Sequence, residues 1–172
     1  MITENSDKRE LLTAIDEAVS GLQELMSSLE ENLVNTVPYK DSWTAGQLFR
    51  HVAKSTKGIA RIMRTDGTPA ERDAGERIPE LKKSFLNFSI KMQSPEFIIP
   101  ETGPYEKGAI IEEMNKSFKL LQESTNTANL SGLVDGLPLG AITKLEAIHF
   151  VLYHTQRHLH QMKKICDAVK TK

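Results

Sequence analysis

The sequence predicts an all-α fold, a four-helix bundle with a long crossover connection between its second and third helices. Four long segments repeat apolar residues at intervals of three or four positions, which is the period of a helix with one buried face. The connections between these segments differ greatly in length, from a few residues to about 40. A connection of that length allows the third helix to run parallel to the second, as in bundles with one crossover.

The first two predicted helices span residues 3–35 and about 43–67, from Trp43 to Gly67. Pro38 marks the end of the first helix, because proline has no backbone N–H to donate within a helix. Thr44 and Gln47 have the spacing of a capping box at the start of the second helix. Since only a few residues join the two helices, we expect them to be antiparallel neighbours.

The long connection covers residues 65–104. Part of it, residues 79–92, is predicted to be a short amphipathic helix, because Pro79 suits the first helical turn. Three of its side chains are expected to face inward: Leu81, Phe85 and Phe88. The segment 94–104 is expected to be extended, with the Phe-Ile-Ile run at 97–99 packed against the bundle.

The third and fourth predicted helices span residues 107–125 and 143–169. Thr143 and Glu146 form a second capping-box pattern at the start of the last helix. No segment indicates a strand ladder. A chain of this length is expected to form one domain, which here covers residues 1–172.

Composition excludes several classes of function. The net charge of −1 gives no electrostatic reason to expect a nucleic acid or an anionic membrane as a partner. No run of about 18 apolar residues indicates a membrane span, and the polar N-terminus does not resemble a signal peptide. The single cysteine, Cys166, excludes an internal disulfide and fits a reducing cytoplasm. We therefore expect a cytoplasmic protein.

Three of the five histidines lie within the sequence "YHTQRHLHQ", residues 153–161. A helix turns about 100° per residue, so His154 and His158 lie within the apolar stripe, roughly 40° apart. His149 and His160 fall on the polar side of the same helix. Two histidines are therefore expected to face inward and two outward.

His51 lies at the edge of the buried face of the second helix. Together with His154 and His158 it would form an open three-histidine metal site, in which a fourth position is left for water or substrate. Two alternatives stay open: the inward pair could be hydrogen-bonded core residues, and His51 could be a solvated residue near the start of its helix.

Two other metal motifs are excluded. The Glu-x-x-His element from Glu146 to His149 occurs once, whereas di-iron bundles need two such elements and two further glutamates. The His-Glu-x-x-His motif of zinc proteases does not occur in the sequence.

The sequences "SWTAGQLFRHVAKS" (42–55) and "TKLEAIHFVLYHTQRHLHQMKKI" (143–165) resemble the DinB-like (DinB/YfiT) superfamily of four-helix-bundle metal proteins. The resemblance implies three metal ligands: His51, His154 and His158. It also matches Gln161 to a polar residue after the second histidine of the pair, and Trp43 to a structural aromatic residue at the start of the second helix.

The resemblance further implies that the chain binds a divalent metal, zinc or nickel, and forms a homodimer. Characterised members of the superfamily include transferases and isomerases that use low-molecular-weight thiols. The leading hypothesis is a metal-dependent thiol S-transferase, or a related lyase or hydrolase, acting on a small-molecule substrate. The alternatives are a non-enzymatic metal-binding or stress-response protein and a metal-free helical interaction domain. The candidate hydrogen-bond partners of the histidine rings are Gln47, Ser55, Tyr153 and Gln161.

Overall fold

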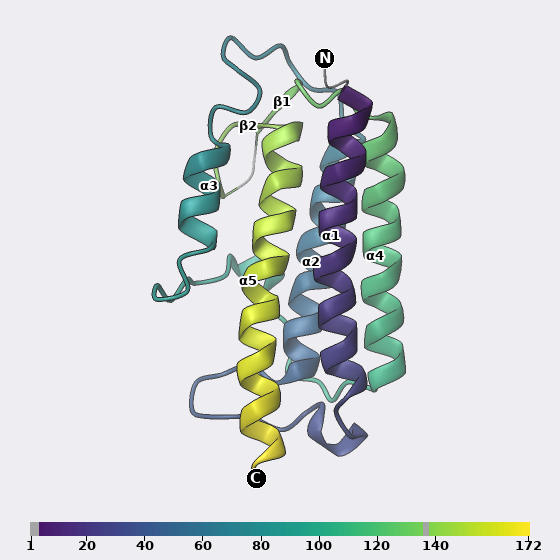
Figure 1. The fold of residues 1–172 in the computed structure, drawn as a ribbon, viewed down its shortest axis with the longest axis vertical. Coiled ribbons are helices and arrows are strands. Elements are labelled where there is room, and N and C mark those ends of the chain that lie inside the picture. The colour runs from purple at the N-terminus through teal and green to yellow at the C-terminus, as the bar shows by residue number, and fades with distance from the viewer. Residues whose placement is uncertain (1–3, 136–137) are drawn as a thin grey trace.

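The computed structural model describes residues 4–135 and 138–172 and is built around four long helices. These are α1 (Glu4–Ser27), α2 (Ala45–Met63), α4 (Lys107–Thr127) and α5 (Lys144–Lys170). In Figure 1, α2 and α4 run in the same direction, and α1 and α5 run opposite to them. The predicted all-α bundle is thus confirmed, and the long crossover connection joins the two parallel helices, α2 and α4 (Figure 1).

The first helix ends earlier than predicted, at Ser27. The chain then turns through a short 3₁₀ helix, η1 (Glu31–Leu33), which lets both Leu29 and Val34 be buried. The carbonyl oxygen of Val34 accepts a 2.9 Å hydrogen bond from the backbone N–H of Gly46. The apolar residues beyond Ser27 therefore close the end of the bundle instead of extending the helix.

Both predicted capping boxes are present. Thr44 accepts a hydrogen bond from the Gln47 backbone at 3.1 Å, and the Gln47 side chain accepts one from the Thr44 backbone at 3.0 Å. Thr143 and Glu146 make the same pair of bonds at 3.1 and 2.9 Å. These bonds satisfy backbone N–H groups that have no partner within the helix, and so fix where α2 and α5 begin.

The second helix ends at Met63 and not at Gly67. The buried Lys144 ammonium donates hydrogen bonds to the carbonyl oxygens of Met63 and Thr65, at 3.1 and 2.5 Å. A cation at this position stabilises the free carbonyl groups and the negative end of the helix dipole. Gly67 instead packs against Gly132, where an added Cβ would lie 2.8 Å from the neighbouring Cα.

The crossover contains the short helix α3 (Ile78–Phe85), with Leu81 and Phe85 buried as predicted. The expectation for Phe88 was wrong, because its side chain is 42% exposed and stacks on His160. The helix ends at Phe85, after which Asn87 accepts hydrogen bonds from Ser89. Because the chain leaves the helix at this turn, the helical spacing no longer places Phe88 on the same face as Leu81 and Phe85.

The second half of the crossover forms another 3₁₀ turn, η2 (Glu96–Ile98). Only Ile98 of the Phe-Ile-Ile run is buried, whereas Phe97 is 65% and Ile99 is 47% exposed. The prediction that this whole run packs against the bundle was therefore wrong. A tight turn presents one side chain inward at a time, and here that residue is Ile98.

The first half of the crossover is fixed to α5 by an ion pair between the partly buried Arg72 and the fully buried Glu146. The Arg72 guanidinium donates two hydrogen bonds to the Glu146 carboxylate, at 2.6 and 2.7 Å, and the Arg77 backbone N–H donates a third at 2.8 Å. Beside it lies a two-stranded antiparallel ladder, β1 (Leu133–Val134) and β2 (Ile142–Thr143). A strand of two residues is too short to show the alternation of polar and apolar residues by which a strand is predicted from a sequence.

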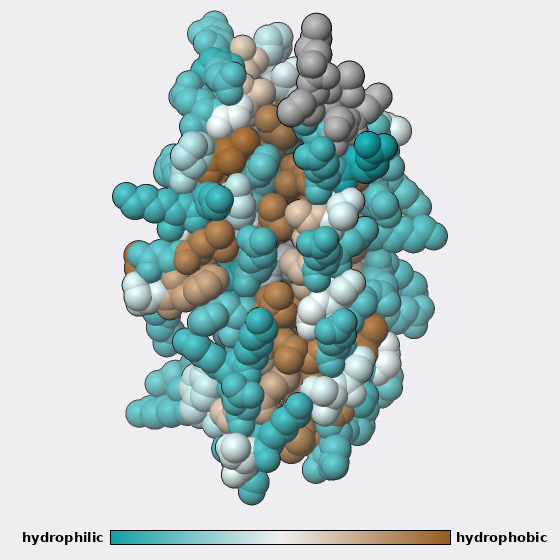
Figure 2. Space-filling view, in the orientation of Figure 1, coloured by the Kyte–Doolittle hydropathy of each residue, from teal (hydrophilic) through white to brown (hydrophobic). Residues whose placement is uncertain are grey.

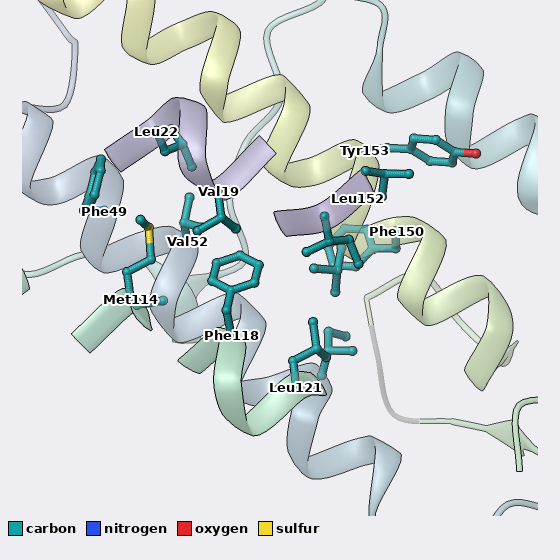
Figure 3. Packing of buried hydrophobic residues seen from close by; sticks show 14 of the residues in the cluster. Val19, Leu22, Phe49, Val52, Met114, Phe118, Leu121, Phe150, Leu152 and Tyr153 are labelled. Atoms are coloured by element: carbon teal, nitrogen blue, oxygen red, sulfur yellow. The ribbon is translucent and has the colours of Figure 1, made fainter. Parts of the chain in front are cut away.

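The core lies between the four long helices. In Figure 3, Val19 and Leu22 of α1 face Phe49 and Val52 of α2, and Met114 and Phe118 of α4 complete the cluster. Figure 2 shows hydrophilic side chains over most of one face, with hydrophobic side chains visible in the furrows between helices. None of the described helices is long and apolar enough to cross a membrane.

Candidate metal centre

The three inward histidines meet in the interior of the bundle. His51 comes from α2, and His154 and His158 come from adjacent turns of α5; each is less than 10% exposed. The Nε2 atom of His154 lies 3.0 Å from that of His51 and 3.1 Å from that of His158. The inward orientation inferred from helical periodicity is confirmed, and His149 and His160 lie outside the cluster, half-buried.

In His51 and His158, the ring nitrogen that points away from the cluster, Nδ1, is hydrogen-bonded to an oxygen atom. His51 Nδ1 lies 2.9 Å from the carbonyl oxygen of Ile98, and His158 Nδ1 lies 2.9 Å from the Oε1 atom of Gln161. Both oxygen atoms can only accept, so each Nδ1 carries the hydrogen and leaves a lone pair on Nε2. Since His154 can supply at most one hydrogen to the group, at least two Nε2 lone pairs point into the cluster.

This donor set fits a divalent metal ion. Tetrahedral zinc with nitrogen ligands at about 2.0 Å separates those ligands by about 3.3 Å, close to the Nε2 separations of 3.0 and 3.1 Å. All three ligand atoms lie within 4.8 Å of one another. Within residues 4–135 and 138–172, no other group of three or more potential ligands converges in this way.

Burial keeps the three imidazoles neutral at pH 7. Desolvation lowers the pKa of His51 and lowers the pKa of His154 well below its usual value. Desolvation, with repulsion from His51, lowers the pKa of His158 to about 3. Protonation would therefore compete poorly for the nitrogen lone pairs, and neutral imidazole is the form that binds metal.

Aromatic side chains enclose the histidines. The Trp43 ring lies 4.7 Å from His51 and 6.4 Å from His158, measured between ring centroids. Phe150 lies 5.1 Å and Phe85 lies 6.3 Å from His154. These ring contacts restrict the orientations of the imidazoles. The sequence predicted a structural role for Trp43, but not its contact with two of the histidines.

The structure separates the four candidate partners of the histidine rings. Gln161 lies beside His158, as described above, and Ser55 lines the cavity next to the cluster. Gln47 instead completes its capping box, and its amide group donates to the Glu101 carbonyl oxygen at 3.5 Å. The Tyr153 hydroxyl lies 3.2 Å from His149 Nδ1 and points away from the packed side chains in Figure 3.

A cavity of about 750 Å³ opens onto the cluster between α2, α5 and the second half of the crossover. All three histidines line it, together with apolar side chains that include Ile62, Phe85 and Phe150. The residue that sequence reasoning missed is Ile98, whose carbonyl oxygen orients His51 across 47 positions of the chain. A backbone carbonyl group leaves no signal in residue identity.

We expect substitution of Gln161 by leucine to weaken zinc binding by about 10- to 100-fold, because His158 loses the acceptor that fixes its tautomer and ring orientation. Competition against a chromophoric chelator measures the affinity. Gln161→Glu retains an acceptor oxygen and should restore most of the affinity, and Gln122→Leu on the exposed face of α4 is the matched control. Equal affinities for all four proteins would exclude this positioning role.

The comparisons with known proteins point to one family. The family model described as the DinB superfamily matches residues 14–162, a span that includes all three clustered histidines. A search of curated proteins returned no match to this chain.

Proposed function

Since the chain belongs to the DinB superfamily, we propose that it is a metal-dependent enzyme and that it transfers a low-molecular-weight thiol to an electrophilic small molecule. The observation that carries the proposal is the cavity of about 750 Å³ that opens onto the convergent histidines. A site that only stored metal or stabilised the fold would need no space of this size beside it.

His51, His154 and His158 would hold the cation, which we propose to be zinc or nickel. A divalent cation bound there supplies positive charge that lowers the pKa of a thiol, so that the thiolate is available at neutral pH. Three protein ligands leave room for such a thiol. The aromatic walls formed by Phe85 and Phe150 would keep water from the reacting atoms.

The reaction needs no protein base. Among the described residues that line the cavity, Glu113 is the only carboxylate, and it is paired with Arg50. In the proposed step the thiol proton passes to solvent, a sulfur–carbon bond forms, and the bond from that carbon to the leaving group breaks. The leaving group departs with its electron pair, so no oxidant or reductant is required.

The test is turnover with a defined thiol and electrophile. We expect zinc- or nickel-loaded protein to accelerate the reaction of bacillithiol or N-acetylcysteine with monochlorobimane, with release of chloride. His160→Ala should retain the activity, and His154→Ala should lose it. Cobalt-loaded protein should also develop a sulfur-to-metal charge-transfer band when the thiol is added. Stable metal binding without this band or turnover would favour the alternative, a non-enzymatic metal-binding protein.

A further inference from the structure

Four basic residues form a stripe along α2 at the edge of the cavity: Arg50, Lys54, Lys57 and Arg61. Their spacing of four, three and four positions places them on one face of the helix. All four line the cavity that opens onto the histidines. The two halves of this basic stripe differ in whether acidic side chains balance their positive charge.

The half nearest the start of α2 is paired. Arg50 makes ion pairs with Glu101, at 2.9 Å, and with Glu113. Lys54 makes an ion pair with Glu101 at 3.1 Å and donates to the Ile99 carbonyl oxygen at 3.0 Å. These contacts fix the second half of the crossover over the metal site, and their positive charge is already compensated.

The other half of the basic stripe is not compensated. The side chains of Lys57 and Arg61 are exposed and make no hydrogen bond or ion pair to any residue in the described part of the chain. Lys91, from the crossover, also lines the cavity and is exposed without such a partner among the described residues. Among the described residues that line the cavity, the only carboxylate is that of Glu113, which is paired with Arg50, so none balances the charge of Lys57 and Arg61.

Gly58 lies between the two uncompensated cations and also lines the cavity. An added Cβ atom at this position would meet no atom within 4 Å, so packing does not require a glycine here. Glycine in the middle of a helix is less stable than alanine. Its presence leaves space in the cavity wall beside Lys57 and Arg61, which is the space that a ligand group bound by them would occupy.

The distance from the histidines gives the size of the ligand. Arg61 follows His51 by ten residues, which is roughly 15 Å along the helix axis. Between His51 and Arg61 on α2 the cavity is lined by Ser55, Gly58 and Ile59 as well as by the basic stripe, and the apolar Phe85 and Phe150 line it from α3 and α5. A ligand that reaches both ends therefore needs an apolar middle section.

We infer that the cavity binds an organic anion with one end at the three histidines, an apolar middle section, and a carboxylate or similar group held by Lys57 and Arg61. This inference rests on the proposed function for the identity of the histidine-bound end. It adds that the substrate, or the thiol itself, is anionic at the end remote from the reacting atoms.

The test compares acids with alcohols of equal length. The probes are 8-mercaptooctanoate and 8-mercaptooctanol, with 3-mercaptopropionate and 3-mercaptopropanol as a pair too short to reach Arg61. Calorimetry on zinc-loaded protein in low salt should show the eight-carbon acid binding about 10-fold more tightly than the alcohol. The short pair should bind with equal affinities.

The variants locate the effect. Lys57→Gln/Arg61→Gln should reduce the acid-to-alcohol ratio of the eight-carbon pair to about 1 without changing the affinity for the alcohol. Lys40→Gln/Lys119→Gln removes the same charge from exposed positions outside the cavity lining and should leave the ratio unchanged. Gly58→Leu should weaken binding of both eight-carbon ligands and leave the short pair unaffected.

The two proposals can fail separately. Equal affinities for the eight-carbon acid and alcohol in the unmodified protein would overturn the inference about Lys57 and Arg61, whatever the histidines bind. Tighter binding of the acid, lost in the double variant but without a charge-transfer band in cobalt-loaded protein, would support the anion site and contradict thiol binding at the metal.

Discussion

Substitution of His154 by alanine is expected to abolish tight metal binding. The Nε2 atom of His154 lies 3.0 and 3.1 Å from those of His51 and His158, so its removal leaves two ligands with nothing between them. The affinity for zinc should fall by more than about 100-fold, which is the upper end of the effect of losing an outer hydrogen-bond partner. Metal content after dialysis and competition against a chelator measure the loss.

His160→Ala is the matched control for this prediction. His160 is on the same helix, is half-buried and stacks on Phe88 at a centroid distance of 4.1 Å. The variant should bind metal as tightly as the unmodified protein. If His154→Ala kept its metal, or if both variants lost it while retaining their helical circular dichroism, the three-histidine site would be wrong.

Removal of the Arg72 side chain is expected to cause the largest loss of stability. Burial alone would raise the pKa of Glu146, but hydrogen bonds from Arg72, Thr143 and Arg77 lower it, so the carboxylate stays charged with no exposed side-chain surface. Arg72→Leu leaves this charge without its main partner, which should reduce the free energy of unfolding by about 3 kcal/mol. Chemical denaturation at pH 7 measures the change.

A double-mutant cycle separates the ion pair from other effects. Arg72→Leu/Glu146→Gln should be more stable than Arg72→Leu alone, because the glutamine amide carries no charge and its single oxygen atom can still accept from one of the two backbone N–H groups, of Arg77 or Thr143, that now bond to different carboxylate oxygens. Arg9→Leu on the exposed face of α1 controls for loss of one positive charge. Additive effects of the two single substitutions would show that the pair does not couple the crossover to α5.

The long helices and the inward orientation of His154 and His158 could be predicted because both depend on local periodicity. Helical geometry places His154 and His158 one turn apart on the buried face, and Gln161 follows His158 by three residues on the same side. The capping boxes at Thr44 and Thr143 are equally local. Each of these features depends on residues within a few positions of one another.

Features that depend on the crossover could not be predicted in the same way. The orientation of Phe88 depends on where α3 ends, and at that end Arg157 of α5 donates to the carbonyl oxygens of Phe85 and Asn87. The pairing of Arg72 with Glu146 spans 74 positions. Periodicity carries no information about contacts between segments this far apart in the sequence.

X-ray absorption spectroscopy of zinc-loaded protein tests the central claim most directly, because it counts the imidazole ligands of the bound ion. The three-histidine site predicts one zinc ion per chain with three imidazole nitrogens and one further light ligand, all at about 2.0–2.1 Å. Two or fewer imidazoles, or a chain that takes up no zinc, would contradict it. In that case His51, His154 and His158 would be hydrogen-bonded core residues, as the alternative interpretation of the sequence holds.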